Sequence, residues 1–111
     1  MGISTHILDT SVGRPAAGVP VALDEKRGGE WVAVGTAESD ADGRVRQLVP
    51  GGRELADGTL RLRFDVEAYL SREGRRAFFP EVEIVFHYTA GEHYHVPLLL
   101  SPYGYSTYRG S

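Results

Sequence analysis

The chain has 111 residues, of which 41% are hydrophobic and 24% are charged, with a net charge of -3 and a pI near 5.8. This length fits a single domain, residues 1–111, with one modest core and no room for a separate cofactor domain. The slight acidity argues against binding of nucleic acid or of an anionic membrane, and the lack of cysteine excludes disulfides, thiolate nucleophiles and cysteine-ligated zinc.

The N-terminal segment, MGISTHILDT, has neither a basic start nor an apolar run long enough for a signal peptide. Nowhere does the sequence approach the roughly 20 consecutive apolar residues of a membrane-spanning helix. We therefore expect an intracellular, cytoplasmic protein.

Short alternating segments separated by turn residues run along the chain, which is typical of antiparallel sandwiches and barrels. The first segment alternates Ile3, Thr5 and Ile7 with Ser4, His6 and Leu8. Further strands are expected over residues 19–26, 30–38, 44–48, 59–64, 81–88 and 92–101. Turn-rich stretches separate them, namely GG at 28–29, SDADG at 39–43 and PGG at 50–52.

One segment, residues 65–74, changes to helical spacing. Val66, Tyr69 and Leu70 fall on one helical face, Asp65 is suited to cap the N-terminus, and Gly74 is suited to end the helix. The sequence therefore predicts an all-β fold, a two-sheet sandwich of seven or eight strands with one short helix.

The last strand has an unusual outer face. One face carries the core-like Tyr94, Val96, Leu98 and Leu100, and the other carries His93, His95, Pro97 and Leu99. A sandwich strand normally shows a polar face to water, so this uncharged face is expected to be covered. The predicted cover is a second copy of the chain.

The histidines are the first candidates for chemistry, because imidazole is both a base near neutral pH and a metal ligand. His93 and His95 share a face, but two histidines at this spacing are a weak zinc signal without a third ligand, and solvated strand histidines are the simpler interpretation. His6 shares its face with Leu8, so partial desolvation would favour its neutral form and its use as a base. A core histidine bonded to a backbone carbonyl is an equally good interpretation of His6.

The stretch DADGRVR begins like a calcium-binding loop, but no acidic ligand follows at the required position. A tight Asp-Gly hairpin turn explains the same residues. Behind this turn, Arg44 and Arg46 alternate onto one face with Leu48. We interpret Arg46 as a surface cation, while the pattern leaves the role of Arg44 open.

Four blocks in order, THILDTSVGRPAAGVPV, DADGR, FFPEVEIVF and HYHVPLLLSPYGYSTYRGS, cover nearly the whole chain. Together they resemble the transthyretin-related 5-hydroxyisourate hydrolases. The closing Tyr-Arg-Gly-Ser is the signature that separates these hydrolases from transthyretin, the hormone carrier that shares their fold. The resemblance implies a transthyretin-like sandwich and a homotetramer with active sites at the dimer–dimer interface.

The resemblance also assigns residues. It places the catalytic groups of the family on His6, Arg44 and His95, and it places a substrate-binding signature on Tyr108, Arg109, Gly110 and Ser111. The C-terminal tail would then lie inside the assembly and line the pocket.

The implied reaction opens the six-membered ring of 5-hydroxyisourate, the product of urate oxidation, at its N1–C6 amide. Such a step needs an activated water, a cation at the carbonyl oxygen and a proton for the departing nitrogen. His6 or His95 can supply the first and the third, and Arg44 the second, so neither a metal nor a cofactor is expected. The alternatives are a carrier of a small aromatic ligand and a zinc-binding structural protein.

Overall fold

A computed structural model describes residues 2–111, and it contains ten strands and one helix within that range. The strands are β1 (Gly2–Asp9), β2 (Arg14–Pro15), β3 (Pro20–Arg27), β4 (Glu30–Glu38), β5 (Arg44–Val45), β6 (Gly58–Asp65), β7 (Glu81–Tyr88), β8 (His93–His95), β9 (Leu98–Ser101) and β10 (Gly104–Thr107). The helix α1 spans Val66–Arg72. Residues 2–111 contain no helix with the length and apolar character needed to cross a membrane.

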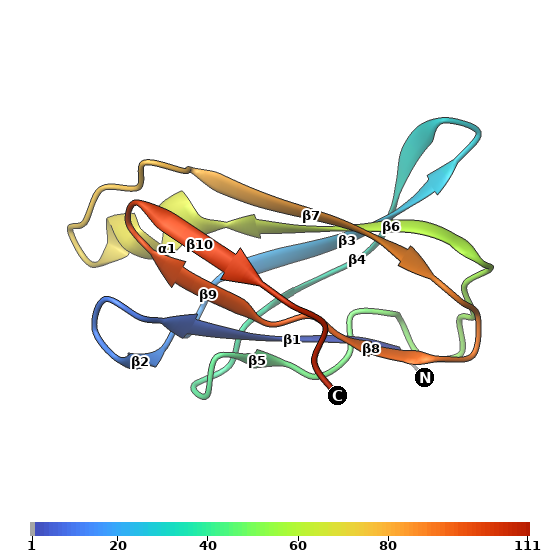
Figure 1. Ribbon diagram of the computed structural model, residues 1–111, viewed down its shortest axis with the longest axis horizontal. Coiled ribbons are helices and arrows are strands. Elements are labelled where there is room, and N and C mark those ends of the chain that lie inside the picture. The colour runs from blue at the N-terminus through green and yellow to red at the C-terminus, as the bar shows by residue number, and fades with distance from the viewer. Residues whose placement is uncertain (1) are drawn as a thin grey trace.

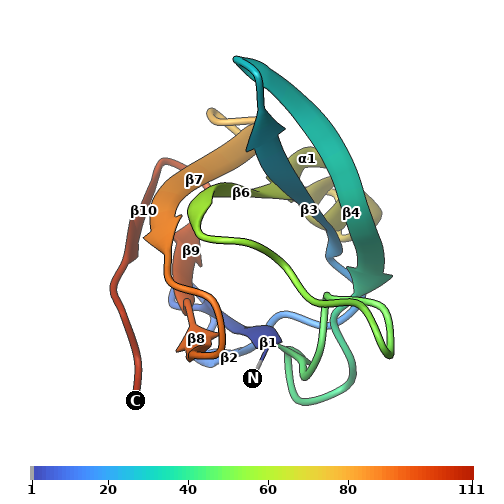
Figure 2. The same cartoon turned by 90° about the vertical axis from the view of Figure 1, so that its right-hand side faces the viewer.

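The strands form two facing sheets (Figures 1 and 2). Sheet I has the order β10-β9-β1-β2, and β5 and β8 also pair with β1. Sheet II has the order β4-β3-β6-β7. Strand β1 is the centre of sheet I, because it runs parallel to β8 and β9 and antiparallel to β2 and β5. The predicted all-β, two-sheet sandwich with one short helix is confirmed.

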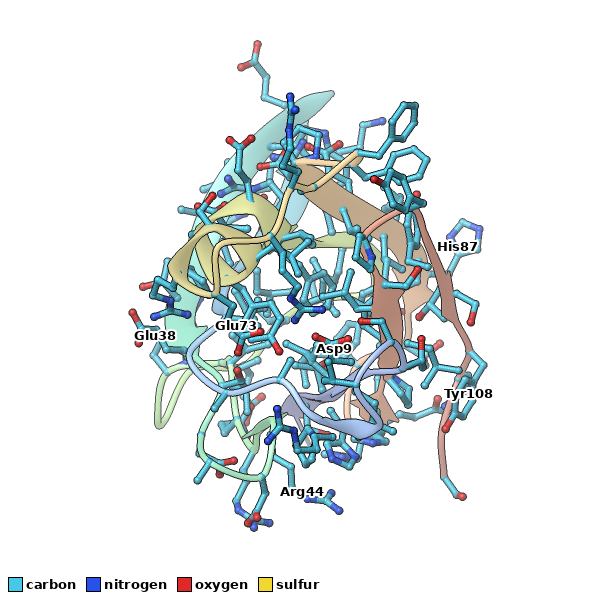
Figure 3. All side chains as sticks on the ribbon, turned by 90° about the vertical axis from the view of Figure 1, so that its left-hand side faces the viewer. Asp9, Glu38, Arg44, Glu73, His87 and Tyr108 are labelled. Carbon is cyan, nitrogen blue, oxygen red and sulfur yellow. The ribbon has the colours of Figure 1, made fainter. Side chains whose placement is uncertain are left out.

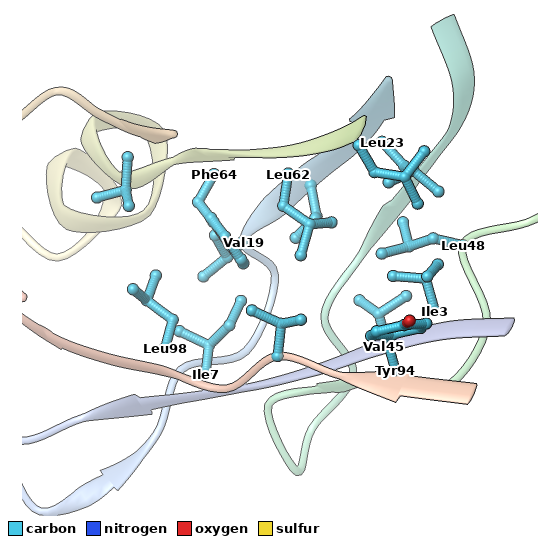
Figure 4. Packing of buried hydrophobic residues seen from close by; sticks show 14 of the residues in the cluster. Ile3, Ile7, Val19, Leu23, Val45, Leu48, Leu62, Phe64, Tyr94 and Leu98 are labelled. Atoms are coloured by element: carbon cyan, nitrogen blue, oxygen red, sulfur yellow. The ribbon is translucent and has the colours of Figure 1, made fainter. Parts of the chain in front are cut away.

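The core lies between the sheets and consists of alternate strand residues, since every second side chain of a strand points to the same face. From sheet I, Ile3, Ile7 and Leu98 are fully buried. Leu62 and Phe64 of sheet II pack in the same cluster (Figure 4). Burying each such side chain stabilises the fold by about 1.5–3 kcal/mol. This burial sets the register of β1, so its intervening side chains must face away from the core.

The predicted helix is confirmed together with its ends. The side chain of Asp65 accepts a hydrogen bond from the backbone N–H of Ala68 at 3.0 Å, as an N-cap does. Gly74, directly after the last turn, has a φ of 69°, a conformation that glycine adopts at little cost.

The strand count exceeds the predicted seven or eight because several pairings are short or interrupted. The strand expected over 92–101 is divided into β8 and β9 at Pro97, which has no N–H to donate to the ladder. The strand expected over 44–48 ends after Val45. There the N–H of Leu48 donates to the carbonyl of Ile3, and the Leu48 side chain turns into the core, away from the face of Arg44.

A buried ionic cluster ties α1 to the end of β1. Asp9 is fully buried in the interior (Figure 3), where it accepts hydrogen bonds from the hydroxyls of Tyr69 at 2.9 Å and Ser11 at 2.6 Å and pairs with Arg75. Burial raises the pKa of Asp9, but the hydrogen bonds from Arg75, Ser11 and Tyr69 outweigh it and hold this pKa below its usual value. The cluster is a structural clamp at the opposite end of β1 from Ser4.

Candidate active site

Strand β1 presents Ser4, His6 and Leu8 on the outer face of sheet I, as the alternation predicted. The parallel ladder with β8 sets His95 beside Ser4, and the antiparallel ladder with β5 sets Arg44 beside His6. Because neighbouring strands lie about 4.8 Å apart, these pairings bring two imidazoles and one guanidinium onto one face. The three residues come from distant parts of the sequence.

The ring of His6 is half-buried, and its Nε2 lies 2.9 Å from the backbone carbonyl oxygen of Asp42. A carbonyl oxygen can only accept a hydrogen bond, so Nε2 carries the proton of the neutral ring and Nδ1 keeps its lone pair. His6 therefore makes the hydrogen bond to a backbone carbonyl that the purely structural interpretation predicted. The residue is not a core histidine, however, and with Nε2 bonded to the carbonyl, Nδ1 is the ring nitrogen that can accept a proton.

The turn over residues 39–43 positions Arg44 beside β1. The Asp40 carboxylate accepts hydrogen bonds from the backbone N–H groups of Asp42 at 2.9 Å and Arg44 at 3.0 Å. Gly43 has a φ of 77°, and a Cβ here would lie 2.4 Å from the carbonyl oxygen of Ile7. The residues that begin like a calcium loop thus form a close-packed turn. It joins β4 of sheet II to β5 of sheet I, so it is not the hairpin that the sequence predicted.

His95 is held through its ring and through its backbone. Its Nδ1 lies 2.8 Å from Ser4 Oγ, and the backbone N–H of Gly110 donates to the His95 carbonyl at 2.7 Å. A Cβ on residue 110 would lie 2.6 Å from Cδ2 of the ring. Glycine is therefore required at position 110 if the ring is to keep its place.

The environment of His95 favours its neutral form. Desolvation lowers its pKa below the ordinary 6.5, and the nearby His6, Arg44 and His93 lower it further, since a second positive charge would be repelled there. At neutral pH the ring is therefore uncharged.

A hollow of about 290 Å³ lies beside these groups on the outer face of sheet I. Its lining consists of Ser4, Thr5, Arg44, Val45, Arg46, His93, His95 and Ser111. His6 is not in this lining, although it lies next to Arg44 in the ladder. A larger hollow of about 430 Å³ on sheet II has no histidine among its described lining residues, so the smaller one is the candidate site.

The C-terminal tail divides between two places. Ser111 lines the hollow with His95, and Gly110 forms a bridge to His95. Tyr108 and Arg109 instead line a separate hollow of about 260 Å³ between β7 and β10. The Cζ of Arg109 lies 4.3 Å from the centroid of the Tyr94 ring. Figure 3 shows Tyr108 and Arg44 on different parts of the surface.

Sequence reasoning missed one residue of the site, Ser4, whose hydroxyl hydrogen bonds to His95. Arg46 is exposed, as its interpretation as a surface cation predicted, and it also lines the hollow. Ser4 lies two residues before His6 on the same strand face, and this spacing could have indicated that Ser4 belongs to the site. The sequence pattern does not show that its partner is His95 of β8. Among residues 2–111, no group of three or more histidine, cysteine or acidic side chains is placed to hold a metal ion.

The sandwich fold is shared by many protein families, and comparison with known proteins identifies the family of this chain. A family model described as the HIUase/Transthyretin family matches residues 3–110. The chain belongs to the HIUase/transthyretin family. The predicted resemblance is thereby confirmed, and it spans almost the whole chain.

Similar members of the HIUase/transthyretin family include proteins named 5-hydroxyisourate hydrolase. One from Salmonella dublin is 46% identical over 98% of this chain and 80% of its own length. One from Mesorhizobium japonicum is 43% identical over 98% of this chain and 91% of its own length. An Arabidopsis thaliana protein named as a bifunctional protein of uric acid degradation is 45% identical over 98% of this chain, which corresponds to 37% of that protein.

The similar solved structures include both a hydrolase and a protein with bound thyroxine. The 5-hydroxyisourate hydrolase of Klebsiella pneumoniae superposes with a TM-score of 0.84 at 39% identity and 100% coverage of both chains. Sea bream transthyretin, solved in complex with thyroxine, superposes with a TM-score of 0.91 at 31% identity, covering 99% of this chain and 95% of its own. The shared fold therefore does not by itself distinguish hydrolysis from ligand binding.

Proposed function

We propose that this chain is a 5-hydroxyisourate hydrolase of urate degradation. It would open the ring at the N1–C6 amide to give 2-oxo-4-hydroxy-4-carboxy-5-ureidoimidazoline. The observation that carries the proposal is the gathering of His6, Arg44 and His95 on one face of sheet I beside a hollow. The named hydrolases among its relatives support the same conclusion.

The chemistry matches the groups present. Hydrolysis of a cyclic amide requires removal of a proton from water, stabilisation of the tetrahedral oxyanion and protonation of the departing nitrogen. Imidazoles are suited to both proton steps, and His6 and His95 each supply one. The permanently charged guanidinium of Arg44 is suited to the oxyanion. The proton taken from water can return to the nitrogen, so the reaction needs no external donor.

The substrate would be bounded by the tail. Ser111 lies in the lining of the hollow, and Gly110 holds the backbone against His95. We assign Tyr108 and Arg109 to the substrate pocket of the assembled protein, although within one chain they line a different hollow. Their place in the site therefore depends on how copies of the chain associate.

We propose a homotetramer with its active sites where two dimers meet. The outer face of sheet I carries the half-buried Leu8 and Leu99 next to the site, and apolar side chains on the face of a sandwich favour association. Large hydrophobic side chains are also exposed in β7 and β10, among them Val85 and Tyr105 at 56% and 44%.

The proposed tetramer can be tested by the mass of the protein in solution. Light scattering on the purified protein should give a mass about four times the 12.1 kDa of the chain at micromolar concentration. A monomeric mass under the same conditions would contradict this assembly. It would also leave the placement of Tyr108 and Arg109 in the pocket without support.

A carrier of a small aromatic ligand is the competing function, and the likeness to the thyroxine complex of sea bream transthyretin favours it. A carrier has no need for two imidazoles and a guanidinium beside one hollow. The discriminating experiment adds the protein to 5-hydroxyisourate generated in situ, and to thyroxine in a separate titration. A hydrolase accelerates decay of the first compound, whereas a carrier leaves the decay rate unchanged and binds the second.

Titration of His95 provides a further expected result. Its NMR signals in the folded protein should show a midpoint below pH 6.5, because desolvation and the neighbouring charges lower its pKa. A lowered pKa means that the ring loses its proton at more acidic pH, so the neutral form persists below pH 6.5. A His95→Gln variant identifies the signals. A midpoint at or above pH 6.5 would contradict the proposed environment.

A further inference from the structure

The hydroxyl of Ser4 lies between two imidazole rings. Its Oγ is 2.8 Å from Nδ1 of His95 and 3.2 Å from Nε2 of His93. The parallel ladder explains the arrangement, because it pairs Ser4 with His95, and His93 projects from β8 on the same side two residues earlier. Ser4 is only 8% exposed, so its hydroxyl is largely shielded from water, whereas the His93 ring is exposed.

A serine hydroxyl has one proton, which limits how the three groups can bond. If Ser4 donates to Nδ1 of His95, it must accept from Nε2–H of His93, and neutral His95 then carries its proton on Nε2. If Nδ1–H of His95 donates to Ser4, the hydroxyl proton points to His93, and Nε2 of His95 is left with a lone pair. The tautomer of His95 is thus coupled to that of His93 through one hydroxyl.

Nε2 of His95, on the side of the ring away from Ser4, is the nitrogen available for chemistry. Ser4 occupies Nδ1, the backbone of Gly110 packs against Cδ2, and no hydrogen bond to Nε2 is found among the described residues. His95 lines the 290 Å³ hollow together with Arg44 and Ser111. A neutral imidazole carries one proton, so the hydrogen bond at Nδ1 decides whether Nε2 has a proton to donate or a lone pair to accept one.

We propose that Ser4 is a positioning residue for the hydrolysis, and that it acts through a hydrogen-bonded chain from His93 through Ser4 to His95. The inference rests on the proposed function. The chain orients the ring of His95 and lets one ring serve in two states. With a lone pair on Nε2 it can accept a proton from water, and with a proton on Nε2 it can donate to the departing nitrogen.

Kinetics of two substitutions test this role. Ser4→Ala should lower kcat about tenfold to a hundredfold, the usual effect of losing a group that orients a functional histidine, and change KM by less than about twofold. Ser4→Thr, which keeps the hydroxyl, should restore most of kcat. Ser71→Ala removes an exposed serine hydroxyl from α1, away from the site, and is the matched control with unchanged kinetics.

A second readout does not depend on turnover. Nitrogen-15 shifts of the His95 ring report the tautomer, and they should differ between the wild-type protein and Ser4→Ala but agree closely between the wild type and Ser4→Thr. A double substitution of Ser4 and His93 by alanine should cost much less than the product of the two single effects, since both residues act through one chain.

Several outcomes would overturn the proposal. They are a Ser4→Ala protein with wild-type kcat, equal losses in Ser4→Ala and Ser4→Thr, and nitrogen-15 shifts of His95 that do not change in Ser4→Ala. If the wild-type protein itself fails to accelerate decay of 5-hydroxyisourate, the proposed function fails. The ring shifts would still report separately whether Ser4 governs the tautomer of His95.

Discussion

Alanine at Arg44 should lower kcat at least about a hundredfold, because the guanidinium is the one permanent positive charge that we assign to the developing oxyanion. Alanine at His6 or at His95 should cause a loss of at least similar size, since each imidazole takes part in a proton transfer. Loss of a group that acts only in the transition state lowers kcat and kcat/KM together while KM stays nearly constant. Steady-state kinetics on 5-hydroxyisourate measure these effects.

The three substitutions should leave the fold intact, because all three side chains lie on the outer face of sheet I and are only half-buried. Thermal unfolding checks this point for each variant. Arg14→Ala, which removes an exposed arginine from β2, is a matched control for loss of a positive charge and should retain full activity. A variant at His6, Arg44 or His95 that keeps wild-type kcat removes that residue from the mechanism.

Substitution of Gly110 by valine should lower kcat by about a hundredfold without a large change in stability. A Cβ at this position would lie 2.6 Å from Cδ2 of His95, so the ring or the tail must move. Displacement of a catalytic group by about 1 Å can cost two orders of magnitude in rate. The backbone of Gly110 makes one bridge to His95 at the edge of sheet I, and the core does not depend on it.

Gly104→Ala is the matched control for Gly110. An added Cβ at position 104 would meet only the Ser101 hydroxyl at 3.8 Å, an ordinary contact distance. This variant should therefore keep wild-type kcat and melting temperature. If Gly110→Val is as active as Gly104→Ala, the tail does not position His95, and the close contact between residue 110 and the ring has no catalytic consequence.

Much of the fold was predictable because local patterns agree with tertiary packing. The alternation of Ile3 and Ile7 with Ser4 and His6 correctly separated the core face of β1 from its outer face. The helix was predictable for the same reason, since Asp65 and Gly74 mark its ends chemically. These signals are short-range, so a single sequence contains them in full.

The parts that escaped prediction depend on long-range pairing. The parallel pairing of β1 with β8, which sets Ser4 beside His95, joins residues about 90 positions apart and leaves no local pattern. The same is true of the turn after β4, whose composition predicts a hairpin although it crosses from sheet II to sheet I. Assignment of His6, Arg44 and His95 as catalytic residues came from family resemblance, and it stays a prediction until the variants are measured.

The most direct test of the account is the decay of 5-hydroxyisourate, generated in situ, at a series of protein concentrations and in parallel with the Arg44→Ala protein. We expect the rate constant for decay to rise in proportion to the concentration of wild-type protein. The Arg44→Ala protein should leave it close to the spontaneous value. A decay rate that is independent of wild-type protein, or that rises equally with both proteins, would contradict hydrolysis by this cluster of residues.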